Sequence, residues 1–258
     1  MTVAIVIPAR YASQRLPGKP LIEIAGRSLL RRVWDIARAV TGTAGVWIAT
    51  DDERIAAHAK GFGAETVMTK PELATGTDRV RAALASMPKP PTSVINLQGD
   101  AVLTPPWVVQ ALVDAFAADH AAGVLTAAVR LSPAGVAEME ALKAKSPSSG
   151  TLVTIDLAGR ALYFSKSMIP FRRDAAAPMH RHIGIYGYRA DVLERLASLP
   201  PSPLERAEGL EQLRALENGI PIRVVLVDYR GRTHGSIDTS EDLDFVTAVI
   251  AREGELVP

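Results

Sequence analysis

Three basic residues lie close together near the N-terminus of this 258-residue chain. Arg10, Arg15 and Lys19 belong to the segment ARYASQRLPGK, which also contains several small residues. Guanidinium and ammonium groups neutralise phosphate oxygens, and small residues allow backbone N–H groups to approach an anion. The segment is therefore suited to a nucleoside triphosphate, although it matches neither the Walker A pattern nor GxGxxG. A solvated basic loop that only connects two elements is the alternative, and the loop alone does not decide between them.

Two aspartates could complete such a site by holding a metal ion. Asp100 ends the segment NLQGD, and Asp238 lies in HGSIDTSEDL. Mg²⁺ prefers one or two carboxylates together with phosphate oxygens and water, so both aspartates are candidate ligands. For Asp238 the alternative is a helix-capping role, because acidic residues favour the positive end of a helix dipole. Asp242 and Asp244 fit that structural role, and we assign them no chemistry.

Composition excludes or disfavours several other kinds of site. The chain has no cysteine, which excludes disulfides, thiolate nucleophiles and Cys-ligated metal centres. Its five histidines lack the paired spacing of a zinc site. The 29 Lys and Arg residues nearly cancel the 28 Asp and Glu residues, and the net charge of +1 gives no general attraction to nucleic acid or anionic lipid. We expect neither nucleic acid nor a membrane as a partner.

The N-terminal sequence bears on localisation. Its apolar run is short and precedes a cationic stretch, which is the reverse of the order in a secretory signal. No segment reaches the apolar length of a membrane span. Together with the missing cysteines, these features lead us to expect a cytoplasmic protein.

The elements that must position these residues alternate between strand and helix. Apolar runs predict strands at 3–8, 46–49, 65–68, 93–97 and 124–129. Helical spacing and capping residues predict helices at 28–40, 52–60 and 107–117. This order predicts an α/β fold with helices on both faces of a mixed, mainly parallel sheet. Ligands of such sheets bind at the carboxyl ends of the strands, where the basic loop and NLQGD both lie.

The segment 132–190 departs from this alternation. It starts with a Lys/Pro/Ser-rich connection, and then two runs at 151–156 and 160–164 predict a hairpin. We interpret it as a β-rich excursion within a single domain that spans residues 1–258. After it, the pattern predicts a strand at 183–189, a helix at 204–217, a strand at 222–227 and a final helix at 240–251 capped by Ser240.

With these residues in view, the chain resembles the 3-deoxy-manno-octulosonate cytidylyltransferase family of the sugar-nucleotidyltransferase superfamily. The resemblance covers nearly the whole chain and rests on eight segments, each weak alone but specific together: IPARYASQRLPGKPL (7–21), ATDD (49–52), TGTDR (75–79), NLQGD (96–100), ALYFSKSMIPF (161–171), RHIGIYGYR (181–189), SPLERAEGLEQLR (202–214) and IDTSEDL (237–243).

The resemblance implies a fold of the nucleotide-diphospho-sugar transferase type and a Mg²⁺-dependent reaction. In that reaction CMP passes from CTP to the anomeric hydroxyl of 3-deoxy-manno-octulosonate (Kdo) or a close analogue, and pyrophosphate leaves. The family also implies a homodimer, to which the 132–190 segment would contribute along with a wall of the sugar pocket. The product would serve lipopolysaccharide or capsule synthesis.

Individual roles follow from the same resemblance. It implies that CTP is bound by Ala9, Arg10, Arg15, Lys19, Thr75, Gly76, Thr77 and Arg79, with 75–77 near the cytosine. It implies that the acid sugar is bound by Gln98, His182, Tyr186, Glu211 and Gln212, with His182 orienting the sugar. Asp100 and Asp238 would hold Mg²⁺, and Lys19, Arg15 and Asp100 would be catalytic. Without the resemblance, a partly buried histidine, a packed strand aromatic and a solvated helix face would explain 182, 186 and 211–212.

Two departures from the family pattern leave the acceptor open. Ala101 and Val102 stand where the family has Glu-Pro after QGD, and we expect them to make the mouth of the site less polar. The segment SPSSGTLVTI at 146–155 lacks the usual Asn-Pro-Asn stretch and the lysine of the following strand. The acceptor could therefore be Kdo, 8-amino-Kdo or a sialic-acid-like sugar.

Two further classes of protein compete with the enzyme. The lost glutamate would suit a catalytically silent nucleotide-binding relative, although the retained basic and acidic residues argue against it. A glycosyltransferase of similar architecture is disfavoured, because no DxD metal motif occurs in or beside the loop after Leu97.

Overall fold

The computed structural model describes residues 2–12 and 16–257, which form two compact units. The first unit comprises Met1–Ala118 and Tyr229–Pro258, and the second comprises Asp119–Asp228. Residues 132–190 all belong to the second unit. Their assignment as an excursion within a single domain stays a prediction.

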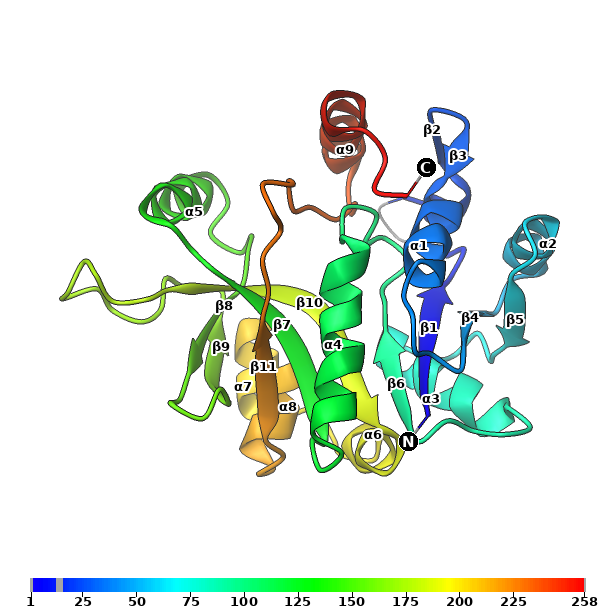
Figure 1. The fold of residues 1–258 in the computed structure, drawn as a ribbon, viewed down its shortest axis with the longest axis horizontal. Helices are drawn as coiled ribbons and strands as arrows, with labels where there is room; N and C mark the ends of the chain where they lie inside the picture. The colour runs from blue at the N-terminus through cyan, green and yellow to red at the C-terminus, as the bar shows by residue number, and fades with distance from the viewer. Residues whose placement is uncertain (1, 13–15, 258) are drawn as a thin grey trace. The chain divides into compact units, whose positions relative to one another are not determined.

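The first unit is built on a parallel sheet. Strands β6, β1, β4 and β5 lie side by side in that order, and every neighbouring pair is parallel (Figure 1). A two-residue antiparallel pair, β2 with β3, follows the basic loop. The elements are β1 (Val3–Ala9), the 3₁₀ turn η1 (Lys19–Leu21), β2 (Glu23–Ile24), β3 (Arg27–Ser28), α1 (Leu29–Arg38), β4 (Gly45–Thr50), α2 (Glu53–Gly61), β5 (Glu65–Met68), α3 (Gly76–Ser86), β6 (Ser93–Asn96), α4 (Pro106–Ala118) and α9 (Ser240–Glu253).

The carboxyl ends of these strands meet at one edge of the sheet. Ala9 at the end of β1 lies opposite Thr50 of β4, and Val6 lies opposite Asn96 at the end of β6. All seven residues of β1 are buried, because helices cover both of its faces. The loops after β1 and β6 therefore leave from the same edge, which brings the basic loop and Asp100 together.

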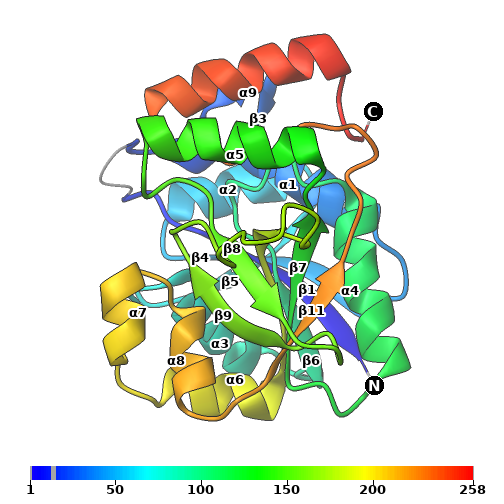
Figure 2. The same cartoon turned by 90° about the vertical axis from the view of Figure 1, so that its left-hand side faces the viewer.

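The second unit has a mixed sheet. Strand β7 pairs in parallel with β11 and antiparallel with β10, and β10 continues to the antiparallel hairpin of β8 and β9, which faces the viewer in Figure 2. Its elements are β7 (Val124–Arg130), α5 (Pro133–Lys145), β8 (Leu152–Ile155), β9 (Ala161–Ser165), β10 (His180–Arg189), α6 (Ala190–Ala197), α7 (Pro203–Glu208), α8 (Gln212–Glu217) and β11 (Ile222–Leu226). The predicted α/β class, with a mixed and mainly parallel set of strands, is confirmed.

Four local predictions need correction. The single helix predicted at 204–217 is two helices, because Gly209 adopts a left-handed conformation with φ of 61° and ends α7. The final helix is capped by Thr239 and not by Ser240. The connection after Ser132 is the helix α5, in which only Val136 and Met139 are buried, so its sequence carries little helical periodicity. Helices α3 and α6 lie where no helix was predicted.

Among residues 2–12 and 16–257, none of the helices combines the length and the apolar character needed to cross a bilayer.

Candidate active site

A cavity of about 310 Å³ opens in the first unit. Three segments that are distant in sequence supply most of its wall, namely the end of β1 with η1, the start of α3, and the loop after β6. The lining residues are Pro8, Ala9, Arg10, Lys19, Pro20, Leu73, Ala74, Thr75, Gly76, Arg79, Gln98, Gly99, Asp100 and Asp238. The structure thus brings together most of the residues to which nucleotide or metal binding was assigned.

Lys19 is the link between the basic and acidic parts of this cavity. Its Nζ donates to Oδ2 of Asp100 at 2.8 Å and to the carbonyl oxygen of Ile237 at 2.6 Å. The same ammonium lies 3.4 Å from Oδ1 of Asp238. The side chains of Lys19, Asp100 and Asp238 are 16%, 24% and 48% exposed, so the pair with Asp100 is the more shielded one. Lys19 is held there by η1, which starts at the left-handed Gly18 and is stabilised by Pro20 in its first turn.

Asp238 does not cap a helix. Thr239 is the N-cap of α9, and Asp242 completes a capping box by accepting from the backbone N–H of Thr239 at 2.9 Å. The carboxylate of Asp238 is therefore left to face Lys19. The capping alternative for Asp238 is wrong, whereas the structural interpretation of Asp242 agrees with its geometry.

The two carboxylates suit a magnesium ion that also binds a substrate. One ammonium reaches both Asp100 and Asp238, which shows that the two side chains can approach a common cation. Within residues 2–12 and 16–257, no group of three or more His, Asp and Glu side chains could hold a metal. Two carboxylates, phosphate oxygens and water are the usual ligands of Mg²⁺ in nucleotide sites, so these residues fit that ion.

The basic loop is only partly described. Arg10 is exposed and lines the cavity, whereas Arg15 lies outside the described residues. Tyr11 and Gly18 are joined by a hydrogen bond, in which the carbonyl oxygen of Tyr11 accepts from the N–H of Gly18 at 2.9 Å. The guanidinium of Arg54 in α2 lies 3.4 Å from the centre of the Tyr11 ring, a cation–π contact that sequence analysis did not anticipate.

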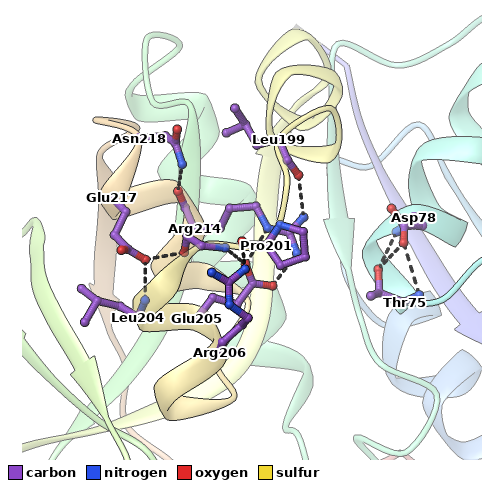
Figure 3. A network of polar contacts seen from close by, with 11 residues as sticks. Thr75, Asp78, Leu199, Pro201, Leu204, Glu205, Arg206, Arg214, Glu217 and Asn218 are labelled. Carbon is purple, nitrogen blue, oxygen red and sulfur yellow. Dashed lines mark hydrogen bonds and ion pairs between the residues drawn. The ribbon is translucent and has the colours of Figure 1, made fainter.

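The start of α3 forms a second wall. Thr75 is its N-cap, and Oγ1 of Thr75 accepts from the N–H of Asp78 at 3.0 Å and donates to the Asp78 carboxylate at 2.9 Å (Figure 3). Gly76 lines the cavity in the first turn, where free backbone N–H groups favour an anion. Thr77 is buried and does not line the cavity.

Close packing explains two glycines at this wall. A Cβ on Gly76 would lie 2.9 Å from Oε1 of Gln98, and a Cβ on Gly99 would lie 2.9 Å from the carbonyl oxygen of Pro8. Neither distance is compatible with an ordinary side chain. The absence of a side chain at 99 is what lets the loop after β6 approach the end of β1.

Arg79 and Gln98 are held by internal partners. The guanidinium of Arg79 is buried and donates to Asp51 at 3.0 Å, so its charge is already balanced within the first unit. The amide nitrogen of Gln98 donates to Oδ1 of the buried Asn96 at 2.8 Å. Gln98 was assigned to the acid sugar, but the structure places it among the residues assigned to CTP.

The other four residues assigned to the acid sugar lie in the second unit. His182 and Tyr186 belong to β10, and their rings are 5.5 Å apart across an irregularity in the strand. His182 is buried and not partly exposed, with Nε2 3.0 Å from Oγ1 of Thr126. Burial lowers the pKa of His182 to about 3, so the ring is neutral at neutral pH. Burial also raises the pKa of Tyr186 well above its usual value.

Glu211 is the N-cap of α8 and Gln212 is its first residue, close to the contacts that join α7 to α8. Arg214 in α8 donates through Nε to Glu205 in α7 at 2.7 Å (Figure 3). Glu205 also accepts from the backbone of Ser202 at 3.0 Å. Gln212 is buried, which rules out a solvated face for that residue. Its amide nitrogen has no hydrogen-bond partner, so it is free to bind an oxygen atom of a ligand.

Comparison with known proteins decides the family. The cytidylyltransferase family model matches residues 4–223. The chain is 52% identical to the 3-deoxy-manno-octulosonate cytidylyltransferase of Maricaulis maris strain MCS10, with 100% of both chains covered. The chain belongs to the 3-deoxy-manno-octulosonate cytidylyltransferase family. The Escherichia coli cytidylyltransferase of the same name is 40% identical over 96% of both chains.

Solved structures share the cytidylyltransferase fold of this chain. A structure of CMP:2-keto-3-deoxy-manno-octonic acid synthetase in complex with CTP superposes with a TM-score of 0.87 at 39% identity, covering 98% of this chain and 100% of that one. A cytidylyltransferase from Leptospira borgpetersenii serovar Hardjo-bovis, strain JB197, gives 0.63 at 17% identity, with 98% and 87% covered, and shows the shared fold alone.

The departures from the cytidylyltransferase pattern have structural explanations. Val102 is buried, and neither it nor Ala101 lines the cavity of the first unit, so their expected effect on the polarity of the site mouth stays a prediction. The segment 146–155 is anchored from α5, because the Nζ of Lys143 donates to the carbonyl oxygens of Gly150 and Lys166. Burial lowers the pKa of that lysine.

Sequence analysis missed several contributors to this cytidylyltransferase site. Ile237 and Tyr11 lie inside the segments that carry the resemblance, but no role was assigned to them, and Arg54 lies outside those segments. Asn96 could have been found, because it lies in NLQGD only two residues before Gln98.

Proposed function

We propose that this chain transfers CMP from CTP to the anomeric hydroxyl of Kdo, with Mg²⁺ as cofactor and pyrophosphate as the second product. The observation that carries the proposal is the convergence of Lys19, Asp100 and Asp238 on one cavity, which Arg10 and the start of α3 also line. The names of the 52% and 40% identical relatives support the acceptor, and a 39% identical structure described as a CTP complex supports the donor.

The reaction requires stabilisation of negative charge and little covalent chemistry from the protein. The acceptor oxygen bonds to the α-phosphorus, the bond from that phosphorus to the bridging oxygen of pyrophosphate breaks, and the hydroxyl proton leaves to solvent. Charge then grows on the phosphoryl oxygens. Arg10 and Lys19 supply positive charge in the cavity, and the first turn of α3 supplies backbone donors.

Asp100 and Asp238 would hold Mg²⁺ in this proposal. When bound, the ion would neutralise phosphate charge and lower the pKa of the attacking hydroxyl. Asp100 also accepts from Lys19, which supports a second role in holding the ammonium at the cavity wall. Arg15 stays a predicted contributor to phosphate binding.

In the second unit, His182, Tyr186, Glu211 and Gln212 would bind the acid sugar, and Gln98 stays a predicted sugar contact of the first unit. The unpartnered amide of Gln212 offers a donor to a hydroxyl or carboxylate oxygen. His182 carries no charge at neutral pH, so it would orient the sugar by hydrogen bonding and not act as an imidazolium acid. Tyr186 and Glu211 would complete the polar contacts.

The test crosses the four common nucleoside triphosphates with Kdo, 8-amino-Kdo and a sialic acid, in the presence of Mg²⁺. We expect pyrophosphate release with CTP and Kdo. Release with CTP and only another sugar would reassign the acceptor. Tight CTP binding without release from any pair would instead favour a catalytically silent relative.

We also propose that the chain works as a homodimer. In the 132–190 segment, Leu162 and Phe171 are 61% and 90% exposed, and exposed apolar side chains favour burial against a partner. Light scattering that finds only monomer at assay concentration would contradict this. A cytoplasmic location and a role in lipopolysaccharide or capsule synthesis stay predictions.

A further inference from the structure

The C-terminal residues 253–257, here called the C-terminal clasp, contact three parts of the first unit. The first is the hairpin of β2 and β3, which directly follows Lys19 and η1. Arg32 in α1 is buried and donates to the carbonyl oxygens of Ile24 and Arg27 in that hairpin. The same guanidinium donates to Glu255 of the clasp at 2.7 Å and 3.1 Å. One buried arginine therefore ties the clasp to the segment after Lys19.

The second contact is with the segment that leads to Asp238. Arg232 donates to the carbonyl oxygens of Glu253, Gly254 and Glu255. The backbone N–H and the hydroxyl of Thr233 both donate to the carboxylate of Glu253. Burial alone would raise the pKa of Glu253, but these hydrogen bonds and the nearby Arg252 lower it to about 2, so the carboxylate stays charged.

The third contact is with the loop that follows Asp100. Val102 is buried only two residues after Asp100. Together with Arg32 and Ile36 of α1, it surrounds a void of about 10 Å³ whose remaining wall includes residues 255–257 of the clasp. The loop after β6 therefore lines the same small void as the clasp.

We propose that the C-terminal clasp is a positioning device that holds Lys19, Asp100 and Asp238 at fixed positions relative to one another. This inference rests on the function proposed above. Asp100 and Asp238 share one ammonium, so they repel each other whenever Lys19 turns toward a phosphate. The clasp restrains all three supporting segments and keeps the carboxylates close enough to bind one ion. Glu255 and Arg32 are therefore positioning residues and not catalytic ones.

The variant Glu255→Gln tests the proposal. Arg32 keeps its two carbonyl partners in the hairpin, so Lys19 keeps its support. The clasp still holds Arg232 and Thr233, but it loses its ionic tie to α1, so the clasp and the segment of Asp238 should loosen together. Hydrogen exchange of ligand-free, full-length protein should become at least about tenfold faster in peptides covering 229–239 and stay unchanged in 45–68. The Mg²⁺ concentration for half-maximal activity should rise about five- to tenfold, with the KM for CTP altered less than about twofold.

The control is Asp244→Asn, which also removes one negative charge, from an exposed position of α9. It should leave both measurements unchanged. If Glu255→Gln does not fold, Glu255→Asp provides the weaker form of the test. Unchanged exchange in 229–239, faster exchange spread evenly over the first unit, or an unchanged Mg²⁺ requirement would each overturn the proposal. The exchange measurement needs no substrate. If the chain lacks transferase activity, the proposed function is refuted, but the effect of the clasp on hydrogen exchange can still be measured.

Discussion

The ammonium of Lys19 lies 2.8 Å from Oδ2 of Asp100, although 81 residues separate them in the chain. The contact joins a residue proposed to bind phosphate to one proposed to bind magnesium. Because each side chain fixes the other, a substitution at either position should disturb both functions.

Asp100→Asn should abolish most turnover. The amide keeps the volume of the carboxylate but not its charge, so a Mg²⁺ ligand and the anchor of Lys19 are both weakened. We expect the rate of pyrophosphate release to fall at least about 100-fold, with an unchanged circular dichroism spectrum. Asp244→Asn, at an exposed position of α9, is the control and should keep full activity. A fully active Asp100→Asn would exclude Asp100 as a metal ligand.

Lys19→Met should weaken CTP binding. It removes a charged donor from the cavity while keeping much of the aliphatic stem. The KM for CTP should rise about ten- to 100-fold, and Lys19→Arg should recover only part of the loss, because a guanidinium cannot reproduce the compact ammonium between two carboxylates. Steady-state kinetics at saturating Kdo measures both variants. Equal KM values for wild type and Lys19→Met would contradict a role in binding.

Thr75→Ala should affect stability and nucleotide binding together. The hydroxyl caps α3 through Asp78, and loss of such a cap costs about 1 kcal/mol. The loosened first turn should also raise the KM for CTP a few-fold. Thr75→Ser retains the cap and serves as the control for both. Thermal melts and kinetics of the two variants would show whether the cap matters to the site.

The sheet of the first unit could be predicted because its buried strands are continuous apolar runs. Val3–Ala9 shows this pattern, and the order of strands and helices then indicates one edge for the ligand. Helix α5 could not be predicted, because only two of its residues are buried. The turn between α7 and α8 depends on the left-handed Gly209, which lies inside an otherwise helical pattern.

The candidate site, too, could be predicted only in part. Motifs located Lys19, Asp100 and Asp238, but no spacing indicates that residues 219 apart would share one ammonium. Burial was the property least accessible from sequence. The sequence pattern permits a partly buried His182 and a solvated Gln212, and only the packing of the second unit shows that both are buried.

Gln212→Met should separate function from stability. The side chains have similar volumes, and methionine removes an amide nitrogen that has no hydrogen-bond partner. Burying such a group carries a penalty, so the melting temperature should stay the same or rise. The KM for Kdo should increase about tenfold, while the KM for CTP stays unchanged. A destabilised variant with an unaltered KM for Kdo would show that Gln212 has only a packing role.

His182 should make stability depend on pH in the acid range. Its folded pKa of about 3 lies below the ordinary value of 6.5, so the unfolded chain binds more protons between these values. Stability is then fully present above about pH 6.5 and falls as the pH drops toward 3, by up to about 1.4 kcal/mol per pH unit. Urea unfolding of His182→Phe should show a shallower acid dependence than wild type.

Gly99 limits how this site can change by mutation. Every single-base change in a glycine codon that alters the residue introduces a Cβ or stops translation, and a Cβ at 99 would meet the carbonyl oxygen of Pro8 at 2.9 Å. Because that oxygen belongs to the backbone of a buried strand, no side-chain rotation can relieve the clash. A library covering all substitutions at this codon and selected for activity should return glycine alone, whereas Ala101 and the exposed face of α9 should accept many residues.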